Sequence, residues 1–349
     1  MKNVKSTSQL GTMPFNNLLW ILLLCLLLPG WAFDCKNEKK CKTSRVHGLK
    51  TSDCYRMDFK EFPKCLPNNI EVIELSYNRI RKIYQEDLLL YTYLQHLYLT
   101  DNLIVQLKNN TFAGLEYLET LDLSVNGLLK VPPSIFQLPS LKNLYLSQNK
   151  NINIAESIEE AKPIGSTSLT KLDISYISED SPVEFPDFKE LPLIAFLNIS
   201  GNAFDYLSPK HFAGLCNLQI LDNSNVTAQY ENNCDCWIIN RWLTERNVDF
   251  HTFLCPLFSQ ECSNEQMDPE DLKVFEDCTE KFKNIKQWHV LKKVALWLGG
   301  VLLVILILGI GFVYFGCNKN RKTKKQPIMT LRERVELMHV ENKVENIYI

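Results

Sequence analysis

The pattern that decides the fold of this chain has its clearest copy in Leu118-Glu-Thr-Leu-Asp-Leu-Ser-Val-Asn-Gly-Leu128. Near-copies recur at successive spacings of 24, 24, 23, 28, 25 and 24 residues. A period of roughly 20 to 50 residues is typical of stacked structural units, so we expect a repeat architecture over residues 70–227. The copies begin at Ile70, Leu94, Leu118, Leu141, Leu169, Ile194 and Leu218.

Each copy alternates apolar and polar residues, as in Leu121-Asp-Leu123. This alternation predicts a short strand that turns its leucines inward and its polar neighbours outward. One unit cannot bury its own apolar face, whereas stacked units cover one another and join their strands into a parallel sheet. The recurring Asn, here Asn126, has an amide that can bond the free backbone groups of adjacent turns. We therefore predict an α/β solenoid with a parallel sheet on its concave face.

Two copies depart from the pattern. Ile177 stands where the fifth copy should have Asn, and the longest spacing precedes it, so we expect a kink or an outward bulge there. A short helix is expected on the convex side at 155–162. The seventh copy carries Asn223 in place of an apolar residue. Phe112 and Phe212, in matching convex turns, are expected to fill the core behind the sheet.

Composition bounds the class of protein. A length of 349 residues allows two or three domains, and 46% hydrophobic residues exclude general disorder. The formal net charge of -2 argues against a polyanion-binding surface over the whole protein, and we expect no nucleic-acid partner. Cysteines cluster on both sides of the repeats, which suits an oxidising compartment. Disulfides are expected at Cys35, Cys41, Cys54, Cys65, Cys216, Cys234, Cys236, Cys255, Cys262 and Cys278.

Residues 1–32 have the features of a secretory signal. Lys2 and Lys5 precede an apolar run from Leu18 to Leu28, and small residues permit cleavage before Phe33. An uncleaved signal anchor is the alternative, but a run of about eleven apolar residues is short for a membrane span.

A second apolar run extends without a charge from Val294 to Phe315. Its length suffices for a helix to cross a hydrocarbon layer of ~30 Å. Basic residues are more frequent just after the run than before it, which predicts a cytosolic C-terminus. The expected order is a stalk at 281–293, a transmembrane helix at 294–315 and a cytoplasmic tail at 316–349.

Two features of the tail each allow two interpretations. Ile347, Tyr348 and Ile349 resemble a C-terminal ligand of PDZ domains, so a PDZ-type cytosolic adaptor is one expectation and a frayed terminus the other. Cys317, at the inner edge of the predicted span, is either a palmitoylation site or an idle thiol.

The cysteine-rich segments resemble the caps of extracellular leucine-rich repeat proteins. The N-terminal one includes the segment from Cys54 to Pro67, which leads straight into the first predicted strand. The C-terminal one begins with Cys234-Asp-Cys236-Trp237. A zinc site is the alternative for the N-terminal cysteines, but their spacings lack paired C-x-x-C.

Over residues 33 to about 280 the chain is similar to type I membrane proteins with leucine-rich repeats, including the ectodomains of Toll-like receptors and adhesion receptors. The resemblance implies an N-terminal cap at 33–69 and a C-terminal cap at 228–280. The sequence shows no Toll/interleukin-1 receptor domain after the predicted span, so direct Toll-type signalling is not expected. The family implies pairing of Cys234 with Cys255 and Cys236 with Cys278, which leaves Cys216 and Cys262 for each other. Connectivity cannot be read from sequence alone.

No motif in the sequence indicates catalysis. The six histidines are scattered, and no H-x-x-x-H, nucleophile elbow or phosphate loop is present. We therefore expect neither an enzyme nor a cofactor or metal site.

The repeat register instead predicts a binding surface. One outward position per strand gives the column Glu74, Tyr98, Asp122, Tyr145, Asp173, Asn198 and Asp222. The position two residues earlier gives Val72, His96, Thr120, Asn143, Lys171, Phe196 and Ile220. Tyrosines among carboxylates suit a protein partner, because aromatics anchor interfaces and charges set register and association rate. A further hydroxyl-bearing column, from Ser76 to Ser224, is expected to reflect turn chemistry.

Three sequons mark acceptors for N-glycans, at Asn109, Asn198 and Asn225. Asn198 lies in the outward column, where a glycan would cover the C-terminal part of the surface. The expected ligand-binding residues are therefore those of the first four repeats, namely Glu74, His96, Tyr98, Asp122, Asn143 and Tyr145.

Together these features predict a recognition or adhesion receptor at the plasma membrane, spanning it once with the N-terminus outside. The expected partner is an extracellular protein bound at the concave face. One alternative is a regulatory co-receptor or decoy that pairs with a signalling receptor and does not need its own tail. Another is an enzyme inhibitor held at the membrane.

Overall fold

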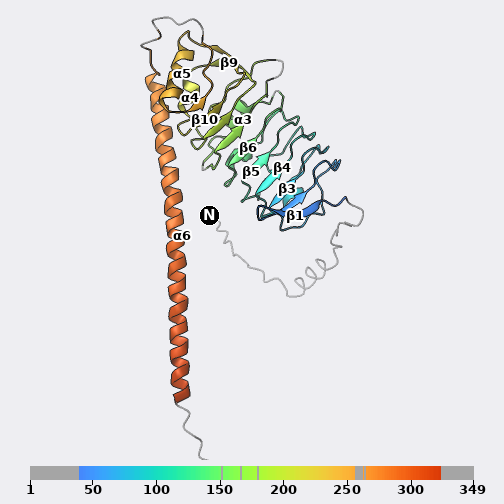
Figure 1. Cartoon of the computed structure of the whole chain (residues 1–349), viewed down its shortest axis with the longest axis vertical. Coiled ribbons are helices and arrows are strands. Elements are labelled where there is room, and N and C mark those ends of the chain that lie inside the picture. Colours follow the sequence, from blue (N-terminus) through green and yellow to red (C-terminus); the bar gives the residue numbers. More distant parts are fainter. Residues whose placement is uncertain are drawn as a thin grey trace, which may run out of the picture. The chain divides into compact units, whose positions relative to one another are not determined.

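The computed structural model describes residues 39–150, 152–165, 167–178, 181–255, 262 and 265–323. The predicted signal, Cys35 and the tail beyond residue 323 lie outside these residues. The chain divides into two compact units, one up to Phe282 and one from Lys283. The repeats and the disulfide-bonded segments belong to the first unit (Figure 1).

Within the described residues, ten strands form one sheet in the order β1-β2-β3-β4-β5-β6-β7-β8-β10-β12. β1 and β2 pair antiparallel as a hairpin, and every later pair in this sheet is parallel. The strands are β1 (Lys42–Val46), β2 (Leu49–Asp53), β3 (Val72–Glu74), β4 (His96–Tyr98), β5 (Thr120–Asp122), β6 (Asn143–Tyr145), β7 (Lys171–Asp173), β8 (Phe196–Asn198), β10 (Ile220–Asp222) and β12 (Asp249–Phe250).

The return segments behind the sheet are mostly irregular. β9 (Ala203–Leu207) and β11 (Thr227–Tyr230) pair with each other in a separate small sheet. The helices are α2 (Gln85–Leu88), the 3-10 helix η1 (Pro133–Gln137), α3 (Ile154–Ala161), α4 (Lys210–Ala213), α5 (Asp235–Glu245) and α6 (Pro269–Thr323).

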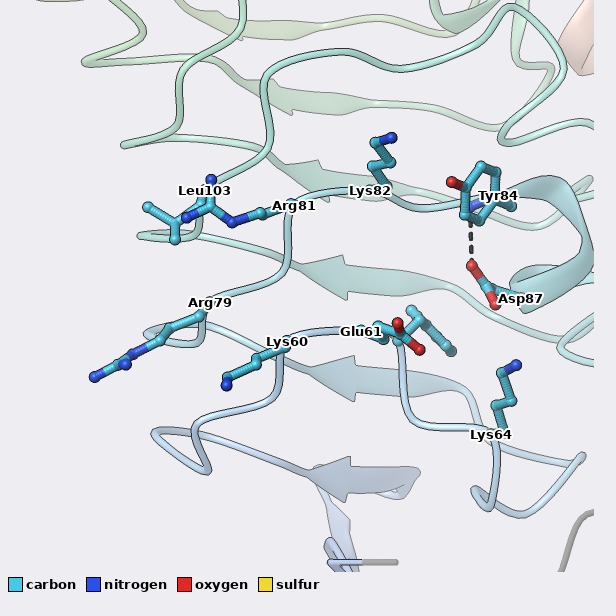
Figure 2. A pocket seen from close by; sticks show the side chains of 10 residues that line it. Lys60, Glu61, Lys64, Arg79, Arg81, Lys82, Tyr84, Asp87 and Leu103 are labelled. Carbon is cyan, nitrogen blue, oxygen red and sulfur yellow. Dashed lines mark hydrogen bonds between the residues drawn. The ribbon is translucent and has the colours of Figure 1, made fainter.

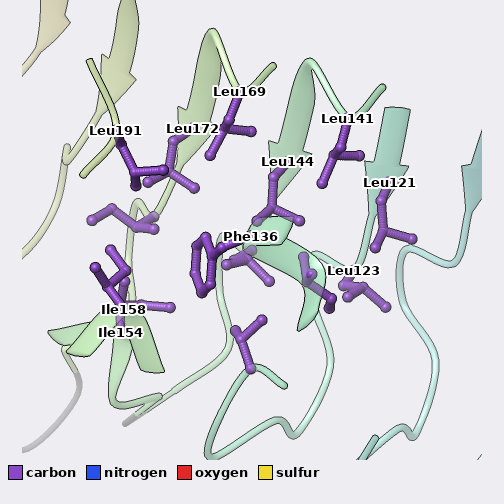
Figure 3. Close-up of a cluster of buried hydrophobic side chains, with 14 of the residues drawn as sticks. Leu121, Leu123, Phe136, Leu141, Leu144, Ile154, Ile158, Leu169, Leu172 and Leu191 are labelled. Carbon is purple, nitrogen blue, oxygen red and sulfur yellow. The ribbon is translucent and has the colours of Figure 1, made fainter. Parts of the chain in front are cut away.

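The core is built from the repeated leucines. The central residues of β4 to β7, which include Leu121 and Leu144, are fully buried. In Figure 3 Leu121, Leu144 and Leu172 follow one another from strand to strand, with Phe136 packed behind them. Burying one such side chain contributes about 1.5–3 kcal/mol, and stacking repeats adds one layer at a time. Phe112 and Phe212 are also buried, as expected for core filler. The predicted solenoid with a parallel sheet is confirmed.

Buried asparagine amides connect each turn to its neighbours. Asn102 Nδ2 donates to the carbonyls of Leu75 and Leu99, at 3.0 Å each, and Asn102 Oδ1 accepts from Ile80 N at 3.0 Å. One side chain therefore satisfies backbone groups of two successive repeats. The same arrangement occurs at Asn78, Asn126, Asn149 and Asn202.

The strand pairing does not show the kink expected at Ile177. β6, β7 and β8 pair residue for residue across the irregular repeat. The extra residues form α3, close to the predicted helix, and Ile154 and Ile158 bury their side chains in the core (Figure 3). The insertion lies behind the sheet, so it leaves the register of the strands unchanged. Ile177 itself is buried, and its N–H donates to Asn202 Oδ1.

Asn223 joins the last repeat to the C-terminal cap. Its side chain is 5% exposed, its Nδ2 donates to the carbonyl of His251 at 2.6 Å, and its Oδ1 accepts from His251 N at 2.9 Å. The departure from the repeat pattern therefore has a structural role, because β12 of the cap extends the sheet next to β10.

The family-based expectation of the cysteine pairing is wrong. The structure joins Cys236 to Cys255, Cys234 to Cys262 and Cys216 to Cys278. Asn240 explains the first pair, because its amide bonds both the N–H and the carbonyl of Phe253. Asn240 lies one helical turn after Cys236 on the same face of α5, so the segment that ends at Cys255 meets Cys236.

The pairing of Cys216 with Cys278 results from the position of the first turns of α6. Cys278, in these turns, accepts a hydrogen bond from Cys216 N at 3.4 Å, so it lies against the last turn of the repeats. Phe275, on the same part of α6, packs edge-on against Trp242 with 5.1 Å between ring centroids. Helix α6 thus covers the end of the solenoid before it leaves the first unit.

The N-terminal cap is a hairpin bonded to the first repeat. Cys41 and Cys54 form a disulfide across β1 and β2, and Cys65 is disulfide-bonded as well. These three cysteines are therefore not thiolate ligands, which rules out the zinc alternative for this set. β2 then pairs parallel with β3 and continues the sheet.

Within the part of the chain that the structure describes, α6 is the one helix long and apolar enough to cross a membrane, by length and composition. It contains both the segment predicted as a stalk and the predicted span, so one helix runs through the two.

We predict that Asn102→Ala lowers the free energy of unfolding by about 1 to 3 kcal/mol, because it leaves Ile80 N–H buried without its partner. The carbonyls of Leu75 and Leu99 each lose one of two amide bonds and keep those from Asn78 and Asn126. Urea unfolding followed by circular dichroism measures this loss. The control is Asn110→Ala, an exposed position whose side chain makes one hydrogen bond, to Gln85. Equal losses in the two variants would contradict the proposed role of the amides.

Candidate functional site

The outward column predicted from the repeats forms one continuous line. The parallel register aligns Asp53, Glu74, Tyr98, Asp122, Tyr145, Asp173, Asn198 and Asp222 on neighbouring strands. From Glu74 to Asp222 these residues are half-buried, and Asp53 is exposed. We call the solvent-facing side of β2 to β8 and β10 the strand face. Asp53 was missed by the sequence analysis, because it belongs to the cap and no L-x-L pattern marks β2.

Negative charge is concentrated on this column. The pKa of Glu74 is raised above its ordinary value, chiefly because burial disfavours the carboxylate and further because Asp53 and Asp122 lie nearby. Burial, followed by the charges of Glu74 and Asp122 and by Tyr145, also raises the pKa of Tyr98. Tyr98 therefore keeps its proton at neutral pH and has a hydroxyl that can donate to a partner.

The neighbouring column contains the other two predicted ligand residues. His96 stacks with Tyr98 at 6.4 Å between ring centroids, and burial lowers the pKa of His96, which keeps the imidazole neutral at pH 7. Its Nδ1 is buried and makes no hydrogen bond within the described residues. Asn143 Nδ2 donates to Thr120 Oγ1 at 3.0 Å, which holds that amide in the sheet surface.

Lys171 is the lysine of this neighbouring column. Its Nζ lies 5.1 Å from the ring centroid of Tyr145 and 4.4 Å from that of Phe196. Cation–π contacts of this kind hold the ammonium group over the two rings. The repeat register predicts the place of Lys171 in this column, but Lys171 was not among the predicted ligand-binding residues.

The acidic side chains also have a structural role at the end of their strands. Ser124 N donates to Asp122 Oδ1 at 2.9 Å, and Ser76 N donates to Glu74 Oε1 at 2.7 Å. Asp173, Asn198 and Asp222 accept from the N–H two residues later in the same way. In two of these turns the hydroxyl takes part as well, since Ser175 Oγ donates to Asp173 Oδ1 and Ser224 Oγ donates to Asp222 Oδ1. One carboxylate oxygen holds the turn, and the other is left for a partner.

The three sequons lie in different places. Asn109 is exposed on a return segment, where its Oδ1 accepts from Ser134 N at 3.0 Å. Asn225 is exposed just after the last repeat strand. Asn198 lies on the strand face between Asp173 and Asp222. Its Oδ1 is used by the turn, so Nδ2 is the amide atom left for a glycan.

Within the residues that the structure describes, no group of three or more His, Cys, Asp or Glu side chains could hold a metal ion.

The leucine rich repeat family profile matches residues 92–150, which include β4, β5 and β6. Tsukushi from Gallus gallus is 33% identical over 157 residues, which cover 44% of this chain and 42% of that protein. The transforming growth factor beta activator LRRC32 from Mus musculus is 32% identical over 164 residues, covering 44% of this chain and 24% of that protein.

The chain therefore contains leucine-rich repeats. Its matches span about half, or less, of the length of these two relatives. A solved octameric complex of latrophilin 3, Unc5D and the FLRT2 leucine-rich repeats is similar to it, with a TM-score of 0.39 and 18% identity. That match covers 62% of this chain and 80% of the solved chain.

In this chain we predict that Glu74→Gln raises stability at pH 7 by up to about 1 kcal/mol. The amide still offers an oxygen to Ser76 N, while the unfavourable charge is removed. Because the folded state raises the pKa of Glu74 above 4.5, the unmodified protein loses stability as pH rises through that value, and the difference should vanish below it. Thermal unfolding at pH 7 and at pH 4 measures the effect.

The control for this pH experiment is Glu116→Gln, at an exposed carboxyl on a return segment. We expect no comparable gain from it. A Glu74→Gln protein less stable than the unmodified one at pH 7 would contradict the prediction.

Proposed function

We propose that this protein is a cell-surface receptor that binds an extracellular protein through the strand face. The observation that carries the proposal is the continuous column of carboxylates and tyrosines from Asp53 to Asp222, interrupted only by Asn198 and in register across the sheet. A secretory signal at 1–32 and a span at 294–315 support a single-pass plasma-membrane topology with the N-terminus outside. A PDZ-type adaptor at the tail and glycans at the three sequons belong to the same proposal.

The chemistry of the strand face favours a basic partner surface. Glu74 and Asp122 flank Tyr98, and the pKa of Glu74 is raised mainly by burial and to a smaller extent by the nearby carboxylates Asp53 and Asp122. Lys or Arg groups of a partner are attracted to these carboxylates, and Tyr98 and Tyr145 supply the aromatic contacts that interfaces favour. Binding and stability are therefore opposed at Glu74, because the charge that destabilises the free protein attracts the partner.

The name of one relative fits a role in protein recognition. LRRC32 is called an activator of transforming growth factor beta. That name does not identify the partner of this chain.

The first four repeats form the proposed contact. Asp173 pairs directly with Asn198 on β8, so a glycan at Asn198 covers Asp173 and leaves the surface from Glu74 to Tyr145 open. His96 and Asn143 lie beside this surface, His96 stacked on Tyr98 and Asn143 held by Thr120.

Proximity labelling on intact cells, with the labelling enzyme fused to the N-terminal cap, identifies the extracellular neighbours of the full chain. The expected result is an enriched secreted or cell-surface protein with a basic patch. Enrichment that persists when Tyr98 and Tyr145 are both changed to Ala would count against the strand face as the contact.

We predict that Asp122→Asn weakens binding to that neighbour by about threefold to tenfold, mainly through a slower association rate. Asp173→Asn is the matched control and should have a smaller effect. Each new amide keeps the oxygen that holds its turn, as Asn198 does in its own repeat, so the comparison isolates charge. Surface plasmon resonance with the full chain measures both rates. Equal effects of the two variants would remove the argument for the first four repeats.

A further inference from the structure

A second surface of the solenoid has the opposite charge. Where the chain leaves β2 and β3 and turns behind the sheet, a cleft of about 640 Å³ is lined by exposed basic side chains. We call it the basic cleft and define it by Lys60, Lys64, Arg79, Arg81 and Lys82. Figure 2 shows Lys60 and Arg79 extending together from adjacent turns, and Lys82 and Lys64 further along the return segments.

Little of this positive charge is neutralised. Arg79 Nε lies 2.8 Å from Asp58 Oδ1, but both side chains are more than half exposed, and such a pair is weak in water. Asp87, at the far end of the cleft, accepts a hydrogen bond from Tyr84 N at 2.9 Å. That bond occupies one of its two carboxylate oxygens.

Three other cations of the cleft form no ion pair with the carboxylates that the structure describes. Lys60, Arg81 and Lys82 make no ion pair within 4.0 Å with any carboxylate in the described ranges. Glu61 is the second carboxylate that lines the cleft. Five cations against two carboxylates leave the lining with a positive balance.

The cations are arranged in rows. Lys60 and Lys64 come from the cap segment, whereas Arg79, Arg81 and Lys82 come from the first repeat. Neighbouring turns of a solenoid follow the strand spacing of about 4.8 Å. The next repeat continues the set with Lys108, whose Nζ lies 5.6 Å from the ring centroid of Tyr84. A linear polymer with regularly spaced negative groups can contact all three turns at once.

We propose that the basic cleft binds a sulfated glycosaminoglycan chain. Arg and Lys pair strongly with the oxygens of sulfate-type anions, and Arg does so through two parallel hydrogen bonds. The lining offers only Tyr84 and Leu103 as exposed apolar side chains, because Phe62 is 2% exposed, so it lacks the aromatic anchors of a protein interface. The acidic strand face repels the same polymer, which restricts it to the flank of the solenoid.

The basic cleft and the strand face have no side chain in common. A cell-surface protein that holds a glycosaminoglycan on its flank keeps the strand face free for a protein partner. The two sites can therefore be tested separately, and failure of one leaves the other standing.

The experiment measures binding of a heparin octasaccharide to the full chain in nanodiscs of zwitterionic lipid, by isothermal titration calorimetry at several NaCl concentrations. We expect saturable binding that weakens as salt rises. In Lys60→Glu/Arg81→Glu, affinity should fall at least about tenfold, because two attractions become repulsions. The control Lys189→Glu/Lys273→Glu makes the same change in formal charge at exposed lysines elsewhere in the first unit and should keep the affinity. Circular dichroism of each variant verifies the fold.

Two further probes test which anionic group of the polymer the basic cleft binds. A fully desulfated heparin octasaccharide should bind at least about tenfold more weakly than the sulfated one. A polyglutamate peptide of equal charge should also bind more weakly. Equal binding of polyglutamate would show a site for acidic protein segments and overturn the proposal. Undiminished heparin binding in Lys60→Glu/Arg81→Glu, or no saturable binding to the unmodified chain, would overturn it too.

Discussion

Every turn of this solenoid has to satisfy backbone N–H and carbonyl groups that no helix or long strand takes up. The repeat strands are three residues long, and the chain leaves the sheet directly after each of them. Unpaired polar groups at that point would lie against the leucine core. The recurring Asn supplies one amide that bonds its own turn and the turn before it. Because each amide bridges two repeats, neighbouring units support one another, and none is expected to be stable alone.

The same constraint shapes the surface. The residue in the middle of each L-x-L faces solvent, and where it is Asp, Glu or Asn its side chain also accepts from the N–H two residues later. Asp, Glu and Asn side chains have the oxygen that accepts this hydrogen bond, so the structure of the turns already makes the strand face acidic. Binding then depends on what lies among the carboxylates, namely Tyr98, Tyr145 and the ammonium of Lys171. The flank behind β2 and β3 has no such requirement, and basic side chains collect there. One solenoid thus carries two surfaces of opposite charge.

The ends of the stack are completed by residues outside the repeat pattern. The hairpin β1–β2 continues the sheet at one end, and β12 continues it at the other. Asn223 replaces an apolar residue so that its amide can hold His251 of the cap. Disulfides then join the cap segments to α5 and to the start of α6. Ends closed in this way keep the leucines of the terminal repeats out of water.

The sequence by itself determined the solenoid, its buried leucines and the outward column from Glu74 to Asp222, because a strand alternates sides and a repeat places equivalent residues in register. It also located the helix α3 and the apolar run of α6. The place of Asp53 in the column, the cysteine pairing and the basic cleft were decided only by the tertiary structure. Asp53 joins the column because β2 of the cap pairs with β3. Cys236 meets Cys255 because Cys236 and Asn240 lie on the same face of α5, and Asn240 binds the segment that ends at Cys255. Lys60 and Arg81 line one cleft because stacked turns bring their return segments side by side, and no pattern within a single repeat encodes that arrangement.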